Sequence, residues 1–338
     1  MSRAVVFAYH EVGVRCLKVL LAHGVDVALV VTHEDNPAER IWFGSVAATA
    51  GEHGLPVIAP ADANDEPTLA AVRACRPDFL FSFYFRQMLA PRLLETAPRG
   101  AYNMHGSLLP RYRGRVPVNW AVLHGERQTG ATLHRMEAKP DRGAIVAQQA
   151  VPILPDDTAG EVFAKVTVAA EIALDGCLPA LLAGSAPHRE QDPAQASYFG
   201  GRRPEDGRID WTQPAARIHD LVRAVAPPYP GAFAVFGDVT IRVLRTLRAQ
   251  PFAPNPSPAD PRAGLFMAGD ALWLRAGDGA LLRVLQAEAD GEPLDAARFG
   301  SRFGAFLPAP PATDAAPSSA DVRTPPSVPD SPKPESPP

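Results

Sequence analysis

The chain has 338 residues, of which 46% are hydrophobic, with a formal net charge of −4 and a pI near 6.1. This length and composition predict a folded protein of two domains. The acidic balance gives no overall electrostatic drive toward nucleic acid or a membrane surface, and leaves room only for a local basic patch.

The three cysteines, Cys16, Cys75 and Cys177, are widely spaced and form no C-x-x-C motif. They indicate neither a disulfide framework nor a zinc site, and we expect buried, small hydrophobic roles for them. The start of the chain runs directly into a strand pattern, and we expect no apolar segment long enough for a signal peptide or a membrane span. The expected location is therefore the cytoplasm.

Short apolar runs alternate with amphipathic stretches through the first half of the chain. This alternation predicts an α/β fold, with a Rossmann-like, mostly parallel sheet, helices on both faces, and ligands beyond the carboxyl ends of the strands. The segment 9–13 lacks the G-x-G-x-x-G pattern, which argues against a dinucleotide cofactor. The expected strands are 4–8, 27–31, 55–58, 79–83 and 100–104, and the expected helices are 12–23, 44–53 and 66–75.

The second half begins with a β-like run at 144–151 and a long helix at 160–182, for which Thr158 is a candidate N-cap. The polar segment 183–208 is broken by Gly and Pro and is typical of a linker. A helix at 215–225, a turn at 227–231 and alternating runs at 239–243 and 271–275 then predict a smaller β-rich domain, such as an OB-like barrel or a sandwich. We expect domains at 1–203 and 204–306, followed by a disordered, Pro-rich tail at 307–338.

Three residues form the strongest candidate for a catalytic site. Side chains two apart on a strand point the same way, so Asn103 and His105 are expected to project together from the end of the strand at 100–104. A carboxylate such as Asp141, returned by a later turn, could favour the charged imidazole, while the Asn103 amide stabilises negative charge on an oxygen. Taken alone, these three residues are weak evidence for a catalytic site, because a core histidine, a turn asparagine and a turn aspartate give the same pattern.

Other polar residues near this motif have plainer interpretations. His10, His33, His124 and His134 lack metal-ligand spacing, and we assign them structural or surface roles and predict no metal. The basic loop 111–115 adjoins the motif, so contact with an anionic ligand is favoured over a merely solvated charge run.

The full string from His105 to Gly114, followed by Pro117 and Trp120, resembles the signature of enzymes that move a formyl group from 10-formyltetrahydrofolate to an amine. Over roughly residues 1 to 300 the chain is similar to the formyltransferase domain of bifunctional polymyxin-resistance proteins, which act on UDP-4-amino-4-deoxy-L-arabinose in lipid A modification. Methionyl-tRNA formyltransferases are also similar, but typically carry Arg-Gly-Ala-Ala-Pro where this chain has Arg-Gly-Arg-Val-Pro at 113–117. The strings that carry the narrower resemblance are 5–10, 32–37, 81–86, 111–120, 132–136, 141–148, 223–226 and 230–233.

The resemblance implies a role for each residue of the trio. His105 would be the proton donor, Asn103 the transition-state stabiliser and Asp141 the group that raises the histidine pKa. It also implies contacts with the folate co-substrate, although the segment 87–89 differs in type from the His-Leu-Ile of relatives, so those contacts are expected mainly from its backbone. The implied folate contacts are Gln87, Met88, Leu89, Arg115, Glu137, Ala138, Lys139, Pro140 and Asp141.

The resemblance further implies partners and leaves alternatives open. The expected acceptor is a nucleotide sugar rather than nucleic acid, and since the decarboxylase half of the bifunctional proteins is missing, a separate decarboxylase chain is expected in the same pathway. Methionyl-tRNA, another amino-sugar nucleotide or water stay open as acceptors, as does a non-catalytic folate-binding scaffold. The oligomeric state is left open.

Overall fold

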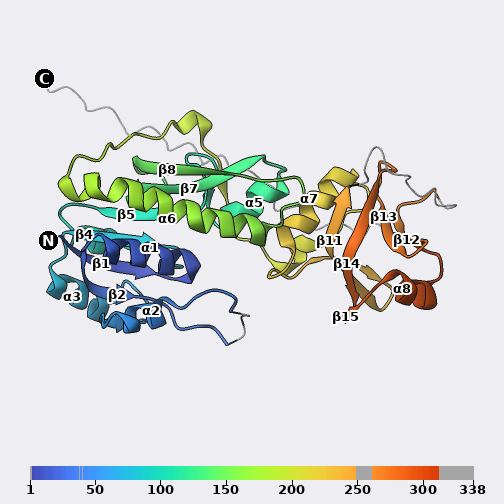
Figure 1. Ribbon diagram of the computed structural model, residues 1–338, viewed down its shortest axis with the longest axis horizontal. Coiled ribbons are helices and arrows are strands. Elements are labelled where there is room, and N and C mark those ends of the chain that lie inside the picture. The colour runs from blue at the N-terminus through green and yellow to red at the C-terminus, as the bar shows by residue number, and fades with distance from the viewer. Residues whose placement is uncertain (1, 38, 40, 249–260, 312–338) are drawn as a thin grey trace, which may run out of the picture.

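The computed structural model describes residues 2–37, 39, 41–248 and 261–311. An N-terminal α/β unit and a C-terminal β-rich unit lie side by side along the long axis of the molecule, with helix α7 (Ala215–Val225) between them (Figure 1).

A seven-stranded sheet forms the centre of the N-terminal unit, in the order β3-β2-β1-β4-β5-β7-β8. Its first five strands are parallel, β7 pairs antiparallel with β5, and β8 pairs antiparallel with β7. The predicted Rossmann-like, mostly parallel sheet is confirmed. Strand order reverses beside β1, which pairs with both β2 and β4, and ligands of such sheets bind at the carboxyl ends near this switch point. The strands are β1 (Arg3–Ala8), β2 (Asp26–Val31), β3 (Val57–Ile58), β4 (Phe79–Phe83), β5 (Ala101–His105), β7 (Gln128–Arg135) and β8 (Ile145–Pro152).

Helices cover both faces of this sheet. Alternate residues of the buried strands enter different cores, as the period of two requires: Phe81 joins the core under α1 and α6, and Leu80 joins the core under α3 and α4. The long α6 runs beside α1 across one face (Figure 1). The helices of this unit are α1 (His10–Ala22), α2 (Val46–Glu52), α3 (Glu66–Cys75), α4 (Pro91–Leu94), α5 (Pro117–Leu123) and α6 (Ala159–Ala183).

Helix α6 begins at a capping box, as expected from Thr158. The Thr158 hydroxyl accepts from the Glu161 N–H, and the Glu161 carboxylate accepts from the Thr158 N–H at 2.8 Å. With a mean hydropathy of 1.7 over its most apolar part, α6 is long and apolar enough to cross a membrane, so our expectation that no segment has this character was wrong. Its fully buried Val162, Val166 and Ala170 belong to the core on the sheet, which is the pattern of an interior helix.

The predicted linker does not run freely between the two units. It returns over the N-terminal unit, where Arg189 and Ile145 exchange backbone hydrogen bonds of 2.8 Å, and its strand β9 pairs with β6 beside the candidate site. The elements involved are β6 (Arg113–Gly114), β9 (Tyr198–Phe199) and the 3-10 helices Pro193–Gln195 and Pro204–Gly207.

The C-terminal unit is an antiparallel sheet in the order β10-β11-β14-β13-β12-β16, with β15 paired to β14. This confirms the β-rich prediction, although the pairings in the described residues run from β10 to β16 without joining them into a closed barrel. Leu307 and Pro308, which we expected to begin the disordered tail, instead pair with β12; residues 312–338 lie outside the described part, and the boundary near residue 203 stays a prediction. The elements are β10 (Ala232–Phe236), β11 (Val239–Arg248), β12 (Gly264–Ala268), β13 (Ala271–Arg275), β14 (Leu281–Ala289), β15 (Glu292–Pro293), α8 (Ala296–Phe303) and β16 (Phe306–Pro308).

Candidate active site

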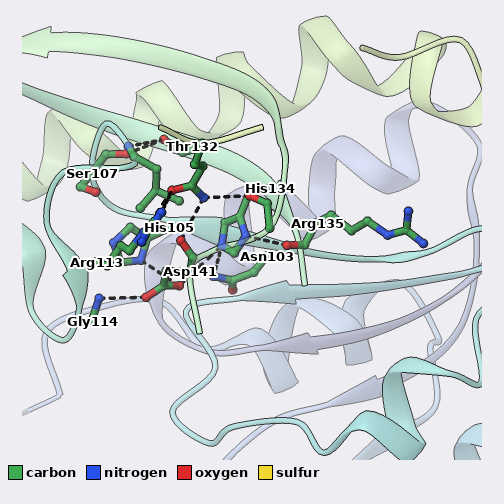
Figure 2. A network of polar contacts seen from close by, with 12 residues as sticks. Asn103, His105, Ser107, Arg113, Gly114, Thr132, His134, Arg135 and Asp141 are labelled. Carbon is green, nitrogen blue, oxygen red and sulfur yellow. Dashed lines mark hydrogen bonds and ion pairs between the residues drawn. The ribbon is translucent and has the colours of Figure 1, made fainter. Parts of the chain in front are cut away.

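The predicted trio comes together at the carboxyl end of β5. Asn103 and His105 both lie on this strand, and Asp141 reaches them from the loop between β7 and β8 (Figure 2). The antiparallel pairing of β5 with β7 sets His134 opposite Asn103 and Thr132 opposite His105. The site is therefore assembled from two neighbouring strands and one loop.

The imidazole of His105 is buried, with 6% of the residue exposed. Its Nε2 lies 2.8 Å from the carbonyl oxygen of Tyr112, and because a carbonyl only accepts, Nε2 carries a proton that it donates there. The other nitrogen, Nδ1, lies 3.6 Å from Oδ1 of Asp141. Nδ1 is thus the ring nitrogen without a backbone partner, and it faces the Asp141 carboxylate.

Asp141 is fixed as an anion by its surroundings. Its Oδ2 accepts from the Gly114 N–H at 2.9 Å, and its backbone carbonyl accepts from the Gln191 amide at 2.9 Å. Burial alone raises the pKa of Asp141, but His105, His134 and the Gly114 N–H together outweigh burial and hold the pKa well below its usual range. Gly114 makes this contact with a φ of +96°, and a Cβ there would lie 2.1 Å from the Phe199 carbonyl oxygen, so no other residue fits.

Asn103 is oriented by His134. The Nδ1–H of His134 donates to the Arg135 carbonyl at 2.8 Å, so in the neutral ring Nε2 is an acceptor, and it lies 3.2 Å from Nδ2 of Asn103 (Figure 2). One amide N–H of Asn103 is therefore engaged, and the second is left to bind an oxygen of a reacting group. The same Nε2 lies 3.5 Å from Oδ1 of Asp141, so His134 adjoins both polar partners of the site.

Thr132 holds the turn that follows His105. Its hydroxyl donates to the Ser107 carbonyl at 2.6 Å and accepts from the Leu109 N–H at 3.2 Å. Gln148 of β8 adds a bond from its amide to the Leu109 carbonyl at 2.9 Å. These bonds fix the loop that carries the basic residues against the end of the sheet.

The basic loop 111–115 has three differently placed arginines. Arg111 pairs with Glu126, and the buried Arg113 donates to the side-chain oxygen of Gln191, so both have partners within the chain. Arg115 is exposed, and its side chain passes Gly201. Arg115 is therefore the arginine of this loop that we expect to bind an anionic ligand. The guanidinium groups of Arg111 and Arg113 are bound to side chains of the protein itself.

The residues expected to contact folate occupy two segments beside the trio. The Gln87 side chain bonds to the backbone of Ala61 and Ala63, which anchors its loop rather than presenting the amide to a ligand. Met88 is 57% exposed, while Leu89 is buried in the same core that Met136 packs against. The four residues Glu137, Ala138, Lys139 and Pro140 lie on the surface of the loop that ends at Asp141.

Two functional contacts were missed by reasoning from the sequence. His134 was assigned a structural or surface role, yet it is only 2% exposed and touches both Asn103 and Asp141. The alternation of Thr132 and His134 on one strand was the signal that could have found it. Gln191 lies in the supposed linker, and no local pattern marked it. Within the described residues, no group of three or more His, Cys, Asp or Glu side chains is arranged to hold a metal ion.

The fold is that of a formyl transferase. A family model of the formyl transferase matches residues 14–176, and a model of the formyl transferase C-terminal domain matches residues 202–304, in the order in which the two units occur. Together they match more than half of the chain, which therefore belongs to the formyl transferase family.

Solved structures of similar fold include enzymes with two kinds of acceptor. The sugar 3N-formyltransferase WlaRD, solved in the presence of dTDP and 5-N-formyl-THF, is 17% identical, with a TM-score of 0.66 over 86% of this chain and 99% of that one. The N-formyltransferase from Helicobacter canadensis, in complex with folinic acid and dTDP-3-aminofucose, is 18% identical, with a TM-score of 0.64 over 84% of this chain and 99% of that one. Methionyl-tRNA formyltransferase from Clostridium thermocellum is 15% identical, with a TM-score of 0.52 over 74% of this chain and 94% of that one.

Proposed function

We propose that this formyl transferase moves the formyl group of 10-formyltetrahydrofolate to the amino group of a nucleotide-linked amino sugar, and that this sugar is UDP-4-amino-4-deoxy-L-arabinose. The observation that carries the chemistry is the assembly of Asn103, His105 and Asp141 around one point at the end of β5. The identity of the acceptor is proposed from the sequence strings shared with polymyxin-resistance formyltransferases. The sugar formyltransferases among the similar folds support an amino sugar as the class of acceptor.

The donor would bind on the side of the site bounded by the segments 87–89 and 137–141. The exposed Met88 side chain and the backbone edges of the loop 137–140 offer apolar contact and hydrogen bonds to a planar heterocycle, and Arg115 offers a guanidinium to a carboxylate. Gln87 would take part only through its backbone, because its side-chain amide is occupied.

The mechanism follows from the positions of the three side chains. The neutral amine attacks the formyl carbon, a C–N bond forms, and negative charge gathers on the formyl oxygen, which the free N–H of Asn103 and the protonated His105 stabilise. The attacking nitrogen loses a proton, the bond from the formyl carbon to N10 breaks, and N10 gains a proton, which leaves tetrahydrofolate. His105 manages these transfers through Nδ1, and Asp141 supports the charged imidazole.

The proposal also sets the context of the reaction. We place it in the cytoplasm, within lipid A modification, with the amino sugar supplied after oxidative decarboxylation by a separate protein. The formal charge of −4 supports a nucleotide sugar over a polyanionic tRNA.

The test is tetrahydrofolate release from 10-formyltetrahydrofolate with UDP-4-amino-4-deoxy-L-arabinose, methionyl-tRNA or no acceptor. The proposal expects release that depends on the sugar nucleotide. Release with tRNA, or at the same rate with water alone, would keep the chemistry and overturn the acceptor and the pathway.

A further inference from the structure

Two polar side chains that the mechanism does not use lie at the switch point of the sheet. His10 follows β1 and Tyr84 follows β4, and both have a left-handed backbone, with φ of +67° and +55°. Non-glycine residues seldom adopt this conformation, and where they do the strain is concentrated at functional sites. The two rings are close neighbours, with centroids 6.2 Å apart.

Both side chains present a buried polar atom that lacks a partner. Within the described part of the chain, Nδ1 of His10 and Oη of Tyr84 are buried and make no hydrogen bond. An unsatisfied buried polar group is costly, so its presence in a fold calls for an explanation such as a ligand that completes it. Burial, assisted by Arg86, lowers the pKa of His10 to about 3, so its imidazole is neutral at physiological pH and can bind an uncharged hydroxyl group.

Aromatic rings surround this pair. Phe43 stacks on His10 at 3.7 Å between centroids, Trp42 meets His10 edge-on at 4.8 Å, and Phe163 lies 4.7 Å from His10 and 5.6 Å from Tyr84. Trp42 is nevertheless 39% exposed, so this aromatic cluster reaches the protein surface. Apolar ring faces around a few convergent polar atoms match the alternating C–H and O–H surfaces of a sugar ring.

The pair adjoins the catalytic residues through the Tyr84 hydroxyl. Oη of Tyr84 lies 1.9 Å from the position that a Cβ on Gly106 would occupy, so the hydroxyl touches the backbone directly after His105. Tyr84 packs with the core on the α1 and α6 face, whereas Leu89 and Met136, beside the proposed donor contacts, pack with the opposite core. A group bound to the pair would therefore lie beside His105.

We infer that His10 and Tyr84, beneath Trp42 and Phe43, form the acceptor subsite, where Nδ1 and Oη hydrogen-bond the hydroxyl groups of the amino sugar. The inference rests on the proposed function and deepens it, since it assigns the residues that would hold the acceptor ring. These are specificity-determining residues, which position the amine and take no part in proton transfer.

The test compares Y84F with wild type, because this change removes only the hydroxyl and keeps the packing of the ring. We expect the KM for UDP-4-amino-4-deoxy-L-arabinose to rise by about threefold to tenfold, the value of one lost hydrogen bond, with kcat changed much less. The Kd for folinic acid should stay within about twofold, and Tm should hold or rise because the removed hydroxyl has no partner in the protein. The His10→Asn variant, which tolerates the left-handed backbone, should raise the same KM.

The control is Tyr102→Phe, which removes a hydroxyl that does have a partner in the chain, the His188 ring at 3.0 Å, and should leave the KM for the sugar unchanged. A wild-type KM in Y84F, or a lower Tm and an equal loss of folinic acid binding, would overturn the inference by showing an idle or structural hydroxyl. If the wild-type protein itself shows no release that depends on the sugar, the proposed function fails and the inference falls with it.

Discussion

The pKa of Asp141 determines the pH range in which its carboxylate is charged beside His105. The pKa of Asp141 is held below its usual range, so the favourable interaction of its carboxylate is fully present above about pH 3.9, the value in an unfolded chain, and is lost only as the pH falls through the lower folded value. Asp141 is therefore ionised throughout the range from pH 5 to 9. A change of rate within that range therefore does not come from the titration of Asp141.

Asp141→Asn removes the charge and keeps the size of the side chain. We expect kcat to fall by about 10²–10⁴-fold, the usual contribution of general acid–base catalysis, because His105 loses the anion beside its Nδ1. Single-turnover formyl transfer measures the loss. The exposed Asp175, whose variant Asp175→Asn serves as a control, should give the wild-type rate, and a wild-type rate in Asp141→Asn would contradict this role.

His134→Phe tests the orientation of Asn103. The ring keeps its approximate size but loses the acceptor for the Asn103 amide, so we expect kcat to fall by about tenfold to a hundredfold through misplacement of that amide. The KM for each substrate should change by less than about twofold, because the contact is to a catalytic group rather than to the substrates. Steady-state kinetics measure kcat and the KM values separately. An undiminished kcat would show that His134 does not orient Asn103 for catalysis.

The positions of Asn103, His105 and Asp141 could be predicted from the sequence. Asn103 and His105 share a strand, so their common direction follows from the period of two, and the resemblance to formyltransferases drew attention to Asp141. His134 was missed because its position depends on the pairing of β5 with β7, and a single sequence does not reveal which strands pair.

Among the elements, α6 supports the site by packing across the sheet that ends in it. Thr158→Ala removes half of its capping box, and we expect a loss of about 1 kcal/mol in the free energy of unfolding, or roughly 2–4 °C in Tm, with kcat unchanged. Thermal unfolding measures the loss. Thr158→Ser keeps the hydroxyl and should retain most of the stability; equal losses in the two variants would show that the methyl group, and not the cap, matters.

Local signals predicted the elements whose ends are marked in the sequence. The helices at 66–75 and 215–225 and the strand at 79–83 have the bounds expected from their patterns. The polar, Gly- and Pro-containing segment 183–208 was interpreted as a linker. Composition does not distinguish a free linker from a loop that packs against a domain. Its return to the site, where Gln191 bonds to both Asp141 and Arg113, depends on contacts between residues about 50 and 78 positions apart.

At the scale of the whole molecule, α7 ties the two units together. Asn119 of α5 donates to the Ala224 carbonyl at 2.8 Å, and His219 lies 2.8 Å from Thr246 of β11 and 3.0 Å from the Pro155 carbonyl of the N-terminal unit. The buried Arg223 pairs with Asp220 at 2.7 Å and donates to the Asp157 carbonyl. These contacts hold the C-terminal unit against the domain that carries the site.

Arg223→Met leaves the Asp220 carboxylate buried without its closer partner. We expect a loss of about 3 kcal/mol in the free energy of unfolding, since breaking one side of a buried pair leaves an uncompensated charge. Denaturant unfolding measures the loss. The exposed Arg217 lies on the same helix, so Arg217→Met is the control and should cost little; equal losses would contradict the importance of the buried pair.

Catalysis by His105 is tested by tetrahydrofolate release in wild type, His105→Ala and the control His53→Ala, whose histidine is exposed at the end of α2. With UDP-4-amino-4-deoxy-L-arabinose as acceptor, we predict release by wild type and by His53→Ala, and a rate lower by at least about a hundredfold in His105→Ala, with folinic acid still bound. An undiminished rate in His105→Ala would contradict the assignment of catalysis to Asn103, His105 and Asp141.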